Sequence, residues 1–524
     1  MTLYNVSINW YDLTARLLMT VQRFTQPMTK TPTLFFMTRR LVVIAAFLIS
    51  LPCVAWGATE EEFFGVYLPN GKIGYMHVRK DTDATYAGKP AVRTENVTQI
   101  SFSVLGNVAK TLSNTVSFND PVTGTPLATE TRSEAAGRVS TVSATYDERG
   151  VSYVADIQGS KKTGTLTLKP GESFLSDPAS GAGSFVPKIG SVLSGKTFVA
   201  ETLRLADEKV TVVRKESVVV GDAKPAELFV VEDRSEMGTV TMFVTPKGET
   251  LLLRFALGME ARKEPKEVAL KLPSTEEISK RGDLAVAMGI TPTGGPLKNP
   301  RAAGSIRYKL RGSTGYLPPS DNRQKITVSG TGKDRVATLS VTAKPLPATA
   351  GVARFARPTD APEALRPFLL PSDYVSSDAP EFAALAKEAT KGEKDLAKAS
   401  AKIAAFVHEA IVSDSSIAVL RTASDINKDR RGVCREYTTF FTAIARNAGI
   451  PTRVCVGVVL STSAFVYHAW PEVWVGDKHG WIALEPTWGR PFADATHIKL
   501  AQGEITDLYR VADDMGRYKI EVIK

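Results

Sequence analysis

The feature that most constrains the fold is a change of hydrophobic period near Pro371. From Glu60 to about Leu270, runs rich in β-branched residues are separated by glycine, proline and aspartate, as in "GTLTLKPG" and "TVTMFVTPKGETLLLRF". Such runs, bounded by turn residues, predict a succession of β-strands. Beyond Pro371 the apolar residues recur at helical spacing, and strand-like runs follow later. The chain is therefore predicted to be multidomain, with a β-rich N-terminal region and an α+β C-terminal domain.

The chain has 524 residues, which is too long for a single hydrophobic core and predicts several domains. We predict a β-rich domain over 58–275, a linker and small β region over 276–370, and a C-terminal domain over 371–524. The stretch "TPTGGPLKNPRAAG" (291–304) indicates where the linker lies, because its prolines and glycines interrupt both kinds of periodicity.

The N-terminus has the features of an export signal. Basic residues ending at Arg40 precede the apolar run Leu41–Leu51, and small residues follow up to Gly57. This pattern predicts a signal over 1–57 that is cleaved near Gly57, with Met37 as an alternative start. The apolar run is short for a membrane span, and an uncleaved anchor is the alternative. We expect an exported protein, periplasmic or extracellular, of bacterial type.

Composition and motifs argue against several classes of function. The net charge is +10, but no basic stripe with interleaved aromatic residues appears, so no nucleic-acid partner is expected. The segment "GSVLSGKT" (190–197) matches a phosphate-loop pattern but lacks the strand–loop–helix context, so no nucleotide is expected. No histidine and cysteine cluster has zinc spacing. We therefore expect neither a metal nor a cofactor.

The segment "RRGVCREYTTFFTAIARNAGIPTRVCVG" (430–457) holds two of the three cysteines. Its apolar spacing predicts a helix that begins near Cys434 and ends before Gly449 and Pro451. Cys455 should lie in the strand that follows. The helix runs about 20 Å, farther than the returning strand covers, whereas a disulfide needs Cα atoms within about 7 Å. Both cysteines are therefore predicted to be free thiols.

Cys434 is a candidate nucleophile because of its place at a helix N-terminus. The helix dipole and the unpaired N–H groups there favour a thiolate, and Gly432 allows close approach to the backbone. For Cys455, burial of one small residue in a strand is the simpler explanation. The candidate base is His468, which opens the strand "HAWPEVWV" and lies later in the chain.

The candidate carboxylate that orients His468 is Glu485. If Gly476 to His479 form a four-residue turn, Val475 pairs with Gly480, and Glu485 becomes a diagonal neighbour of His468 on the same face. The rival carboxylate, Asp477, would lie in the turn about 30 Å away at strand rise. Register therefore selects Glu485.

These blocks, "GVCREYTTFFTAIARNAGIPTRVCVG", "YHAWPEVWV" and "GWIALEPTWG", resemble the transglutaminase-like, papain-type superfamily of thiol enzymes, in its bacterial exported form. The resemblance covers about residues 375–500. It implies a papain-like C-terminal domain in which Cys434 is the nucleophile, His468 the base, and Glu485 occupies the usual aspartate position. That substitution adds one methylene and is the departure from the family pattern.

Four tryptophans, at 470, 474, 481 and 488, fall within the same stretch. Trp470 and Trp488 are predicted to contact an extended substrate, with core packing as the alternative. Arg453 and Arg490 have no assigned role and are expected at the solvated surface.

The sequence thus predicts an exported cysteine acyltransferase, peptidase or amidase that acts on peptide or protein amides through a thioester, using a Cys434–His468–Glu485 triad. The alternative is a catalytically weak or inactive fold that serves as a protein-binding module of the cell envelope. In either case the β domains are candidates to hold an envelope partner.

Overall fold

The computed structural model describes residues 59–523 except 105, 136, 178–185, 222, 236–237, 296, 313–315, 418–419, 509–510 and 512–513. The predicted export signal, with Cys53 and the alternative start Met37, lies outside the described residues. Among the residues that are described, no helix is long and apolar enough to cross a membrane.

In the described part of the chain, the N-terminal region forms one antiparallel sheet of 14 strands, ordered β8-β7-β6-β5-β4-β3-β2-β1-β14-β13-β12-β11-β10-β9. The strands are β1 (Thr59–Leu68), β2 (Gly71–Tyr86), β3 (Lys89–Val104), β4 (Asn107–Asn119), β5 (Pro126–Ala135), β6 (Arg138–Asp147), β7 (Gly150–Ile157), β8 (Ser160–Thr167), β9 (Val192–Val199), β10 (Arg204–Val218), β11 (Ala226–Ser235), β12 (Gly238–Val244), β13 (Thr250–Arg254) and β14 (Glu260–Lys263). The β-rich prediction is confirmed.

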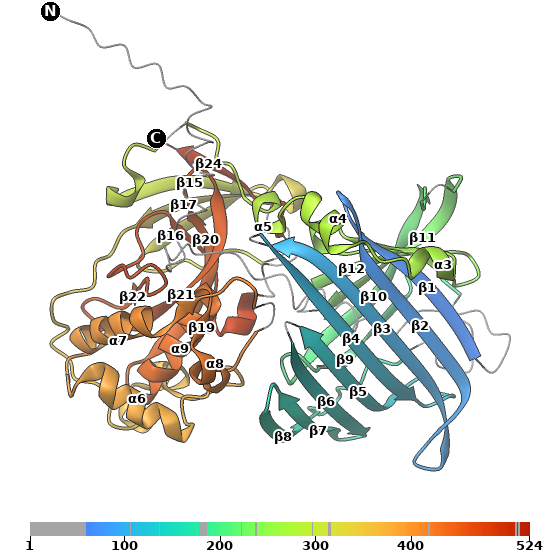
Figure 1. Cartoon of the computed structure of the whole chain (residues 1–524), viewed down its shortest axis with the longest axis horizontal. Helices are drawn as coiled ribbons and strands as arrows, with labels where there is room; N and C mark the ends of the chain where they lie inside the picture. The colour runs from blue at the N-terminus through green and yellow to red at the C-terminus, as the bar shows by residue number, and fades with distance from the viewer. Residues whose placement is uncertain are drawn as a thin grey trace, which may run out of the picture.

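The large sheet curls, so that β10 to β12 lie behind β1 to β4 in Figure 1. Along β4 the residues alternate between buried and more exposed, because successive side chains of a strand point to opposite faces. The interior is partly polar: Thr111, Ser113, Thr115 and Ser117 are all buried. This sheet therefore encloses hydroxyl groups as well as an apolar core.

The phosphate-loop pattern at 190–197 lies mostly on strand β9. Its lysine, Lys196, forms an ion pair with Asp207 at 2.7 Å. A short turn follows and the chain enters β10. The segment is thus built into an antiparallel hairpin, whereas the phosphate loop needs a following helix.

Three short helices and a small sheet connect the large sheet to the rest of the chain. Helices α3 (Lys266–Ala269), α4 (Thr275–Lys280) and α5 (Leu284–Ala287) lie across one end of the large sheet in Figure 1. The small sheet has the order β16-β17-β15-β24, with β15 (Ser305–Arg311), β16 (Gln324–Ser329), β17 (Val336–Thr342) and β24 (Lys519–Ile523). Because its outer strand comes from the C-terminus, this sheet combines the regions 276–370 and 371–524, whose boundaries stay predictions.

The C-terminal domain is α+β, as predicted. It contains α6 (Pro380–Thr390), α7 (Leu396–Ala410), α8 (Ala423–Asp429), α9 (Cys434–Asn447), the short parallel pair β18 (Val412–Ser413) and β19 (Arg431–Gly432), and a sheet ordered β22-β21-β20-β23. The strands of that sheet are β20 (Thr452–Leu460), β21 (Phe465–Trp474), β22 (Trp481–Ala483) and β23 (His497–Gly503). Every residue of α9 from Cys434 to Arg446 is buried, which makes α9 the central helix of the domain.

Helix α9 ends as predicted. Ala448 caps it, and Gly449 then adopts a φ of +77°, which favours glycine. A Cβ at Gly449 would also lie 1.9 Å from the carbonyl oxygen of Phe355. The glycine therefore lets the chain turn directly into β20.

The large sheet and the C-terminal domain share one hydrophobic core. Buried residues of β1, such as Phe64, belong to the same cluster as Tyr308 of the small sheet and Val456 of β20, and Cys434 belongs to it too. Polar contacts also cross the boundary: Tyr374 donates to the carbonyl oxygen of Glu201 at 2.5 Å. The large sheet thus contributes to the same hydrophobic core as Cys434, the first residue of α9.

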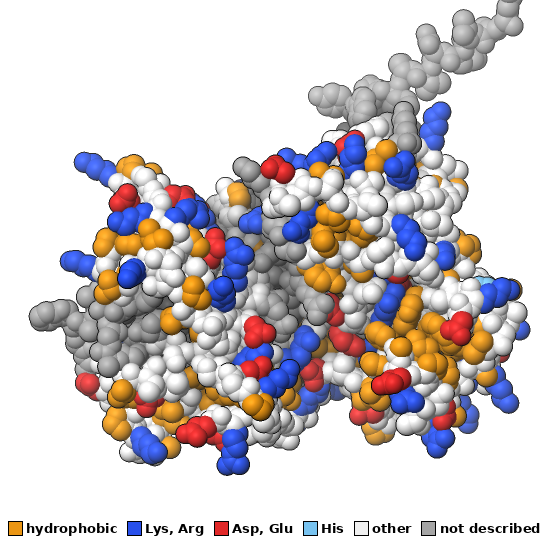
Figure 2. Space-filling model, turned by 180° about the vertical axis from the view of Figure 1, so that it is seen from behind, with side chains coloured by type: hydrophobic (Ala, Val, Ile, Leu, Met, Phe, Trp, Pro, Cys, Tyr) orange, Lys and Arg blue, Asp and Glu red, His pale blue; other side chains and the backbone are white. Residues whose placement is uncertain are grey.

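On the face shown in Figure 2, lysine and arginine side chains are interspersed with aspartate and glutamate side chains. This face therefore carries charges of both signs, and the expectation of no nucleic-acid partner stays a prediction.

Candidate active site

Cys434 is the first residue of α9 and is fully buried. The turn before it is tightly packed: the N–H of Val433 donates to Glu436 Oε2 at 2.9 Å, and a Cβ at Gly432 would lie 2.2 Å from the Cβ of Glu436. Only glycine fits there without displacing Glu436. The thiol therefore lies at the first position of the central helix, beside a turn in which Gly432 and Glu436 are closely packed.

His468 lies on β21, directly opposite Gly457 of β20, and is also fully buried. Its Nε2 lies 2.7 Å from Glu485 Oε2. Its Nδ1 has no nitrogen or oxygen hydrogen-bond partner among the described residues. Burial alone would lower the pKa of His468, but the charge of Glu485 and a hydrogen bond with the Cys434 side chain raise that pKa to about 10. The imidazole is therefore protonated at neutral pH.

Glu485 follows β22 and is fully buried. The predicted register is present, because the N–H of Val475 donates to the carbonyl oxygen of Gly480 at 3.0 Å, and Trp474 pairs with Trp481. Burial raises the pKa of Glu485, but the positive charge of His468 and hydrogen bonds from both neighbouring histidines lower it to about 2. The carboxylate thus stays ionised and accepts the Nε2–H of His468.

A second histidine completes the group. His497, the first residue of β23, places its Nε2 3.0 Å from the same Glu485 Oε2, and it is fully buried. Its Nδ1 lies 3.2 Å from Asp494 Oδ1. Asp494 pairs in turn with Arg301 at 3.2 Å and Arg490 at 3.6 Å. A chain of alternating basic and acidic groups therefore runs inward from Arg490 to Cys434.

The structure brings together all three residues of the predicted triad and adds His497, which the sequence analysis left without a role. The only sequence signal for His497 is weak: it lies in "ATHIKL", the start of a strand-like run after the Glu485 block. Nothing in its spacing predicts that β23 pairs with β20, on the side of β20 away from β21.

The two tryptophans predicted to contact substrate, Trp470 and Trp488, differ in how deeply they are buried. Trp488 is half-buried and stacks on the His468 ring, with centroids 4.7 Å apart and planes at 18°. Its loop is held by a contact with α7, because His408 Nδ1 lies 2.9 Å from the carbonyl oxygen of Pro486. Trp470 is fully buried in a small cluster with Cys455. Substrate contact by either stays a prediction, and the position of Trp470 fits core packing.

Cys455 is a free thiol, as is Cys434. It lies within β20 and is fully buried, and this burial raises its pKa well above the ordinary value for a thiol. A thiol in that environment is a poor nucleophile. Cys455 is therefore a core residue, in agreement with the simpler explanation.

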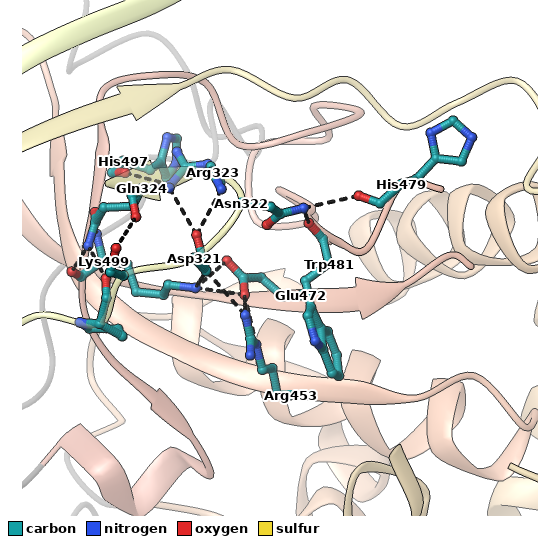
Figure 3. A network of polar contacts seen from close by, with 12 residues as sticks. Asp321, Asn322, Arg323, Gln324, Arg453, Glu472, His479, Trp481, His497 and Lys499 are labelled. Atoms are coloured by element: carbon teal, nitrogen blue, oxygen red, sulfur yellow. Dashed lines mark hydrogen bonds and ion pairs between the residues drawn. The ribbon is translucent and has the colours of Figure 1, made fainter. Parts of the chain in front are cut away.

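Arg453 is not at the surface, and that expectation is wrong. It is buried, and its Nη2 donates to Glu472 Oε2 at 2.6 Å and to Asp321 Oδ2 at 3.3 Å (Figure 3). The fully buried Lys499 also donates to Glu472, at 2.9 Å. Lys499 and Arg453 hold the pKa of Glu472 well below its usual range despite burial. This charged cluster joins β20, β21 and β23 to the loop before β16.

His468, Glu485 and His497 are also the one group found in the described residues whose ligand atoms are placed to hold a metal ion, all within 4.8 Å of one another. The contacts of 2.7 and 3.0 Å to Glu485 Oε2 have the lengths of ordinary hydrogen bonds, and they engage the Nε2 atom of each imidazole. The expectation of no metal stays a prediction.

Comparisons with known proteins bear on the same region. Residues 383–486 match the family model of the transglutaminase-like superfamily, a span that includes Cys434, His468 and Glu485. No curated protein matches the chain.

Three solved structures are similar to parts of the chain. A candidate cysteine protease from Cytophaga hutchinsonii is 19% identical over 41% of this chain and 83% of its own, with a TM-score of 0.31. The periplasmic domain of TgpA from Pseudomonas aeruginosa, bound to ethylmercury, is 20% identical over 38% of this chain and 75% of its own, with a TM-score of 0.26. A β-barrel-like protein from Brucella abortus, of a domain of unknown function, is 11% identical over 40% and 96%, with a TM-score of 0.26.

The motifs, the α+β architecture and the family-model match thus agree, and the C-terminal region of this chain is transglutaminase-like, with residues 383–486 matching the superfamily's model.

Proposed function

We propose that the protein is an exported thiol enzyme that transfers or hydrolyses the acyl group of peptide or protein amides through a thioester on Cys434. The observation that supports this most is the hydrogen-bonded series Cys434–His468–Glu485, in which Nε2 of His468 lies 2.7 Å from Glu485. A thiol at a helix N-terminus beside a protonated imidazole is the arrangement that keeps sulfur nucleophilic at neutral pH.

In the first half-reaction the Cys434 thiolate attacks the amide carbonyl carbon, and the carbonyl π electrons move to oxygen. The backbone N–H of Cys434, at the start of α9, is a candidate donor to the resulting oxyanion. The tetrahedral intermediate then expels the amine, which takes the proton of His468 Nδ1. The product is a thioester on Cys434 and a neutral imidazole whose Nε2–H still binds Glu485.

In the second half-reaction water or an amine attacks the thioester carbonyl, and His468 Nδ1 accepts its proton. Collapse of the intermediate breaks the C–S bond and restores the thiolate beside the imidazolium. Hydrolysis and acyl transfer differ only in this second nucleophile. No cofactor is needed for either route.

We further propose export to the periplasm or the outside of the cell, with a protein or peptide substrate. TgpA is described from its periplasmic domain, which is compatible with this location. The large sheet, which shares a core with α9, is proposed to hold an envelope partner or part of the substrate.

One observation favours a second candidate function. Cys434, His468 and Glu485 are each 0% exposed, which also suits a closed fold that serves as a protein-binding module of the envelope. The two candidates differ in the state of the sulfur, because an inactive module has no need of a thiolate at neutral pH.

Alkylation of Cys434 by iodoacetamide, measured by mass spectrometry between pH 5 and 9, separates the two. The enzyme proposal predicts a rate at pH 6 within about threefold of the rate at pH 8.5. A thiol with an ordinary pKa of about 8.5 would instead react roughly 150-fold more slowly at pH 6. Cys455 in the same digest is the internal control. A steep rise toward pH 8.5, or no alkylation of Cys434 at any pH, would favour the binding module.

A further inference from the structure

Glu485 stands where the superfamily pattern has an aspartate, and its surroundings indicate how the longer side chain is held. A glutamate has one more rotatable bond than an aspartate. When only one hydrogen-bond partner holds its carboxylate, the side chain therefore has more accessible rotamers. Here a single oxygen, Oε2, accepts from two imidazoles, at 2.7 Å from His468 and 3.0 Å from His497. The second contact removes the freedom that the additional methylene introduces.

His497 is itself firmly placed. Its Nδ1 lies 3.2 Å from Asp494 Oδ1, so in the imidazolium form both ring nitrogens donate to carboxylates. Arg323, buried in the loop before β16, donates through Nη1 to the carbonyl oxygen of His497 at 2.9 Å and through Nη2 to that of Asp494 at 2.6 Å. Arg323 and His497 appear together in Figure 3.

The strand that carries His497 is also held two residues further along, at Lys499. The side chain of Gln324 accepts the backbone N–H of Lys499 at 2.9 Å and donates to its carbonyl oxygen at 2.8 Å. The Lys499 side chain lies in the charged cluster with Glu472. His497 therefore has little freedom to move away from Glu485.

We propose that His497 is a positioning residue that fixes Glu485 against His468, so that the superfamily's aspartate is replaced by a glutamate clamped between two histidines. His497 does not touch the reacting atoms and acts through Glu485. This inference rests on the proposed function, since it concerns the orientation of the imidazole that activates Cys434.

The test compares two near-isosteric variants. In His497→Gln the amide lies near the position of Nε2 and still donates to Glu485, whereas in His497→Asn it lies near the position of Nδ1 and faces Asp494. The readout is the rate of Cys434 alkylation by iodoacetamide at pH 6, with the melting temperature of each variant alongside. We expect His497→Asn to lower the rate about 10-fold, as loss of an outer hydrogen-bond partner typically does, and His497→Gln to stay within about threefold of wild type.

A double variant sharpens the test. Glu485→Asp alone shortens the side chain so that it no longer reaches both histidines, and it should lower the rate. In the His497→Asn background the same change should cost much less, because the clamp is already lost. Additive effects of the two changes would overturn the proposal.

Three other outcomes would also count for or against a positioning role for His497. Equal rates for wild type, Asn and Gln, with melting temperatures lowered in both variants, would make His497 structural only. A wild-type rate that falls on dialysis against EDTA and returns with zinc would make the three residues a metal site and overturn the positioning role. A wild-type Cys434 without enhanced reactivity at pH 6 would instead contradict the proposed function. In that case the positioning role is read from [15N]histidine NMR, where His497→Asn but not His497→Gln should shift the ring N–H signal of His468.

Discussion

Buried carboxylates occur in both halves of the molecule, and their neighbours give them opposite properties. In the large sheet, Glu208 of β10 and Asp233 of β11 are buried and hydrogen-bonded to each other. Burial raises the pKa of both, and the charge of Glu208 raises the pKa of Asp233 further. In the C-terminal domain, Glu485 is buried more completely, yet its pKa is lowered to about 2. Burial thus favours the neutral form of the first pair, whereas the partners of Glu485 favour its charged form.

The difference lies in the partners. Burial disfavours the charged form of any carboxyl group by a similar mechanism, so only a cation or several hydrogen-bond donors reverse the direction. Two histidines do this for Glu485, whereas Asp233 faces a second acid, Glu208. A buried acid thus points to the proposed chemistry only where basic groups keep it ionised. The predictions below test that contrast.

The largest effect is expected from Cys434→Ala. Without the sulfur no thioester can form, so turnover of any acyl donor should fall by at least about 10,000-fold, as for loss of a nucleophile in a triad. The melting temperature should stay within a few degrees of wild type. The matched control is Cys455→Ala, which should keep its activity. Turnover that survives in Cys434→Ala would end the enzymatic account.

Glu485→Gln should have the next largest effect. An amide in place of the carboxylate removes the negative charge that both histidines face. Turnover should fall roughly 1,000- to 10,000-fold, approaching the loss of about 10,000-fold for asparagine in place of the aspartate of a serine triad. The exposed turn residue Asp477 provides the control, because Asp477→Asn should leave kcat unchanged. If Asp477→Asn lowered kcat more than Glu485→Gln, Glu485 would not be the residue that orients His468.

The pH profile tests the raised pKa of His468. The imidazolium must donate a proton to the leaving amine, and its pKa of about 10 places the loss of that proton far above the ordinary histidine range. Turnover should therefore hold through pH 8 and decline by about tenfold per unit above pH 10. A decline that begins near pH 6.5 would show an imidazole without the influence of Glu485.

The smallest effect is expected in the large sheet. The raised pKa values of Glu208 and Asp233 mean that the fold favours their neutral forms, so the pair costs stability as pH rises above about 4, where the unfolded chain ionises. Asp233→Asn removes that cost. Relative to wild type, the free energy needed to unfold this variant should be about 1 kcal/mol larger at pH 8 than at pH 4.

Much of the site was predictable because it depends on local rules. A period of two residues and a four-residue turn fix the register of β21 against β22, and this register identifies Glu485 as the partner of His468. The helix that begins at Cys434 and ends before Gly449 follows from apolar spacing and a terminal glycine. These features need only neighbouring residues in the chain.

The parts that were missed depend on distant pairings. His497 reaches Glu485 only because β23 joins β20, and Arg453 is buried only because Asp321, 132 positions away, and Glu472 accept its guanidinium. In the same way β24 pairs with β15 across nearly the whole C-terminal half of the chain. No periodicity in a single sequence encodes such partners.

The central claim is that the sulfur of Cys434 carries an acyl group during turnover. The most direct measurement incubates the protein with peptide donors or envelope extract, quenches at low pH and searches for an adduct by mass spectrometry. The account predicts an adduct on Cys434 that hydroxylamine releases and that is absent from Cys434→Ala. An adduct that persists in that variant, or that forms equally on Cys455, would contradict the account.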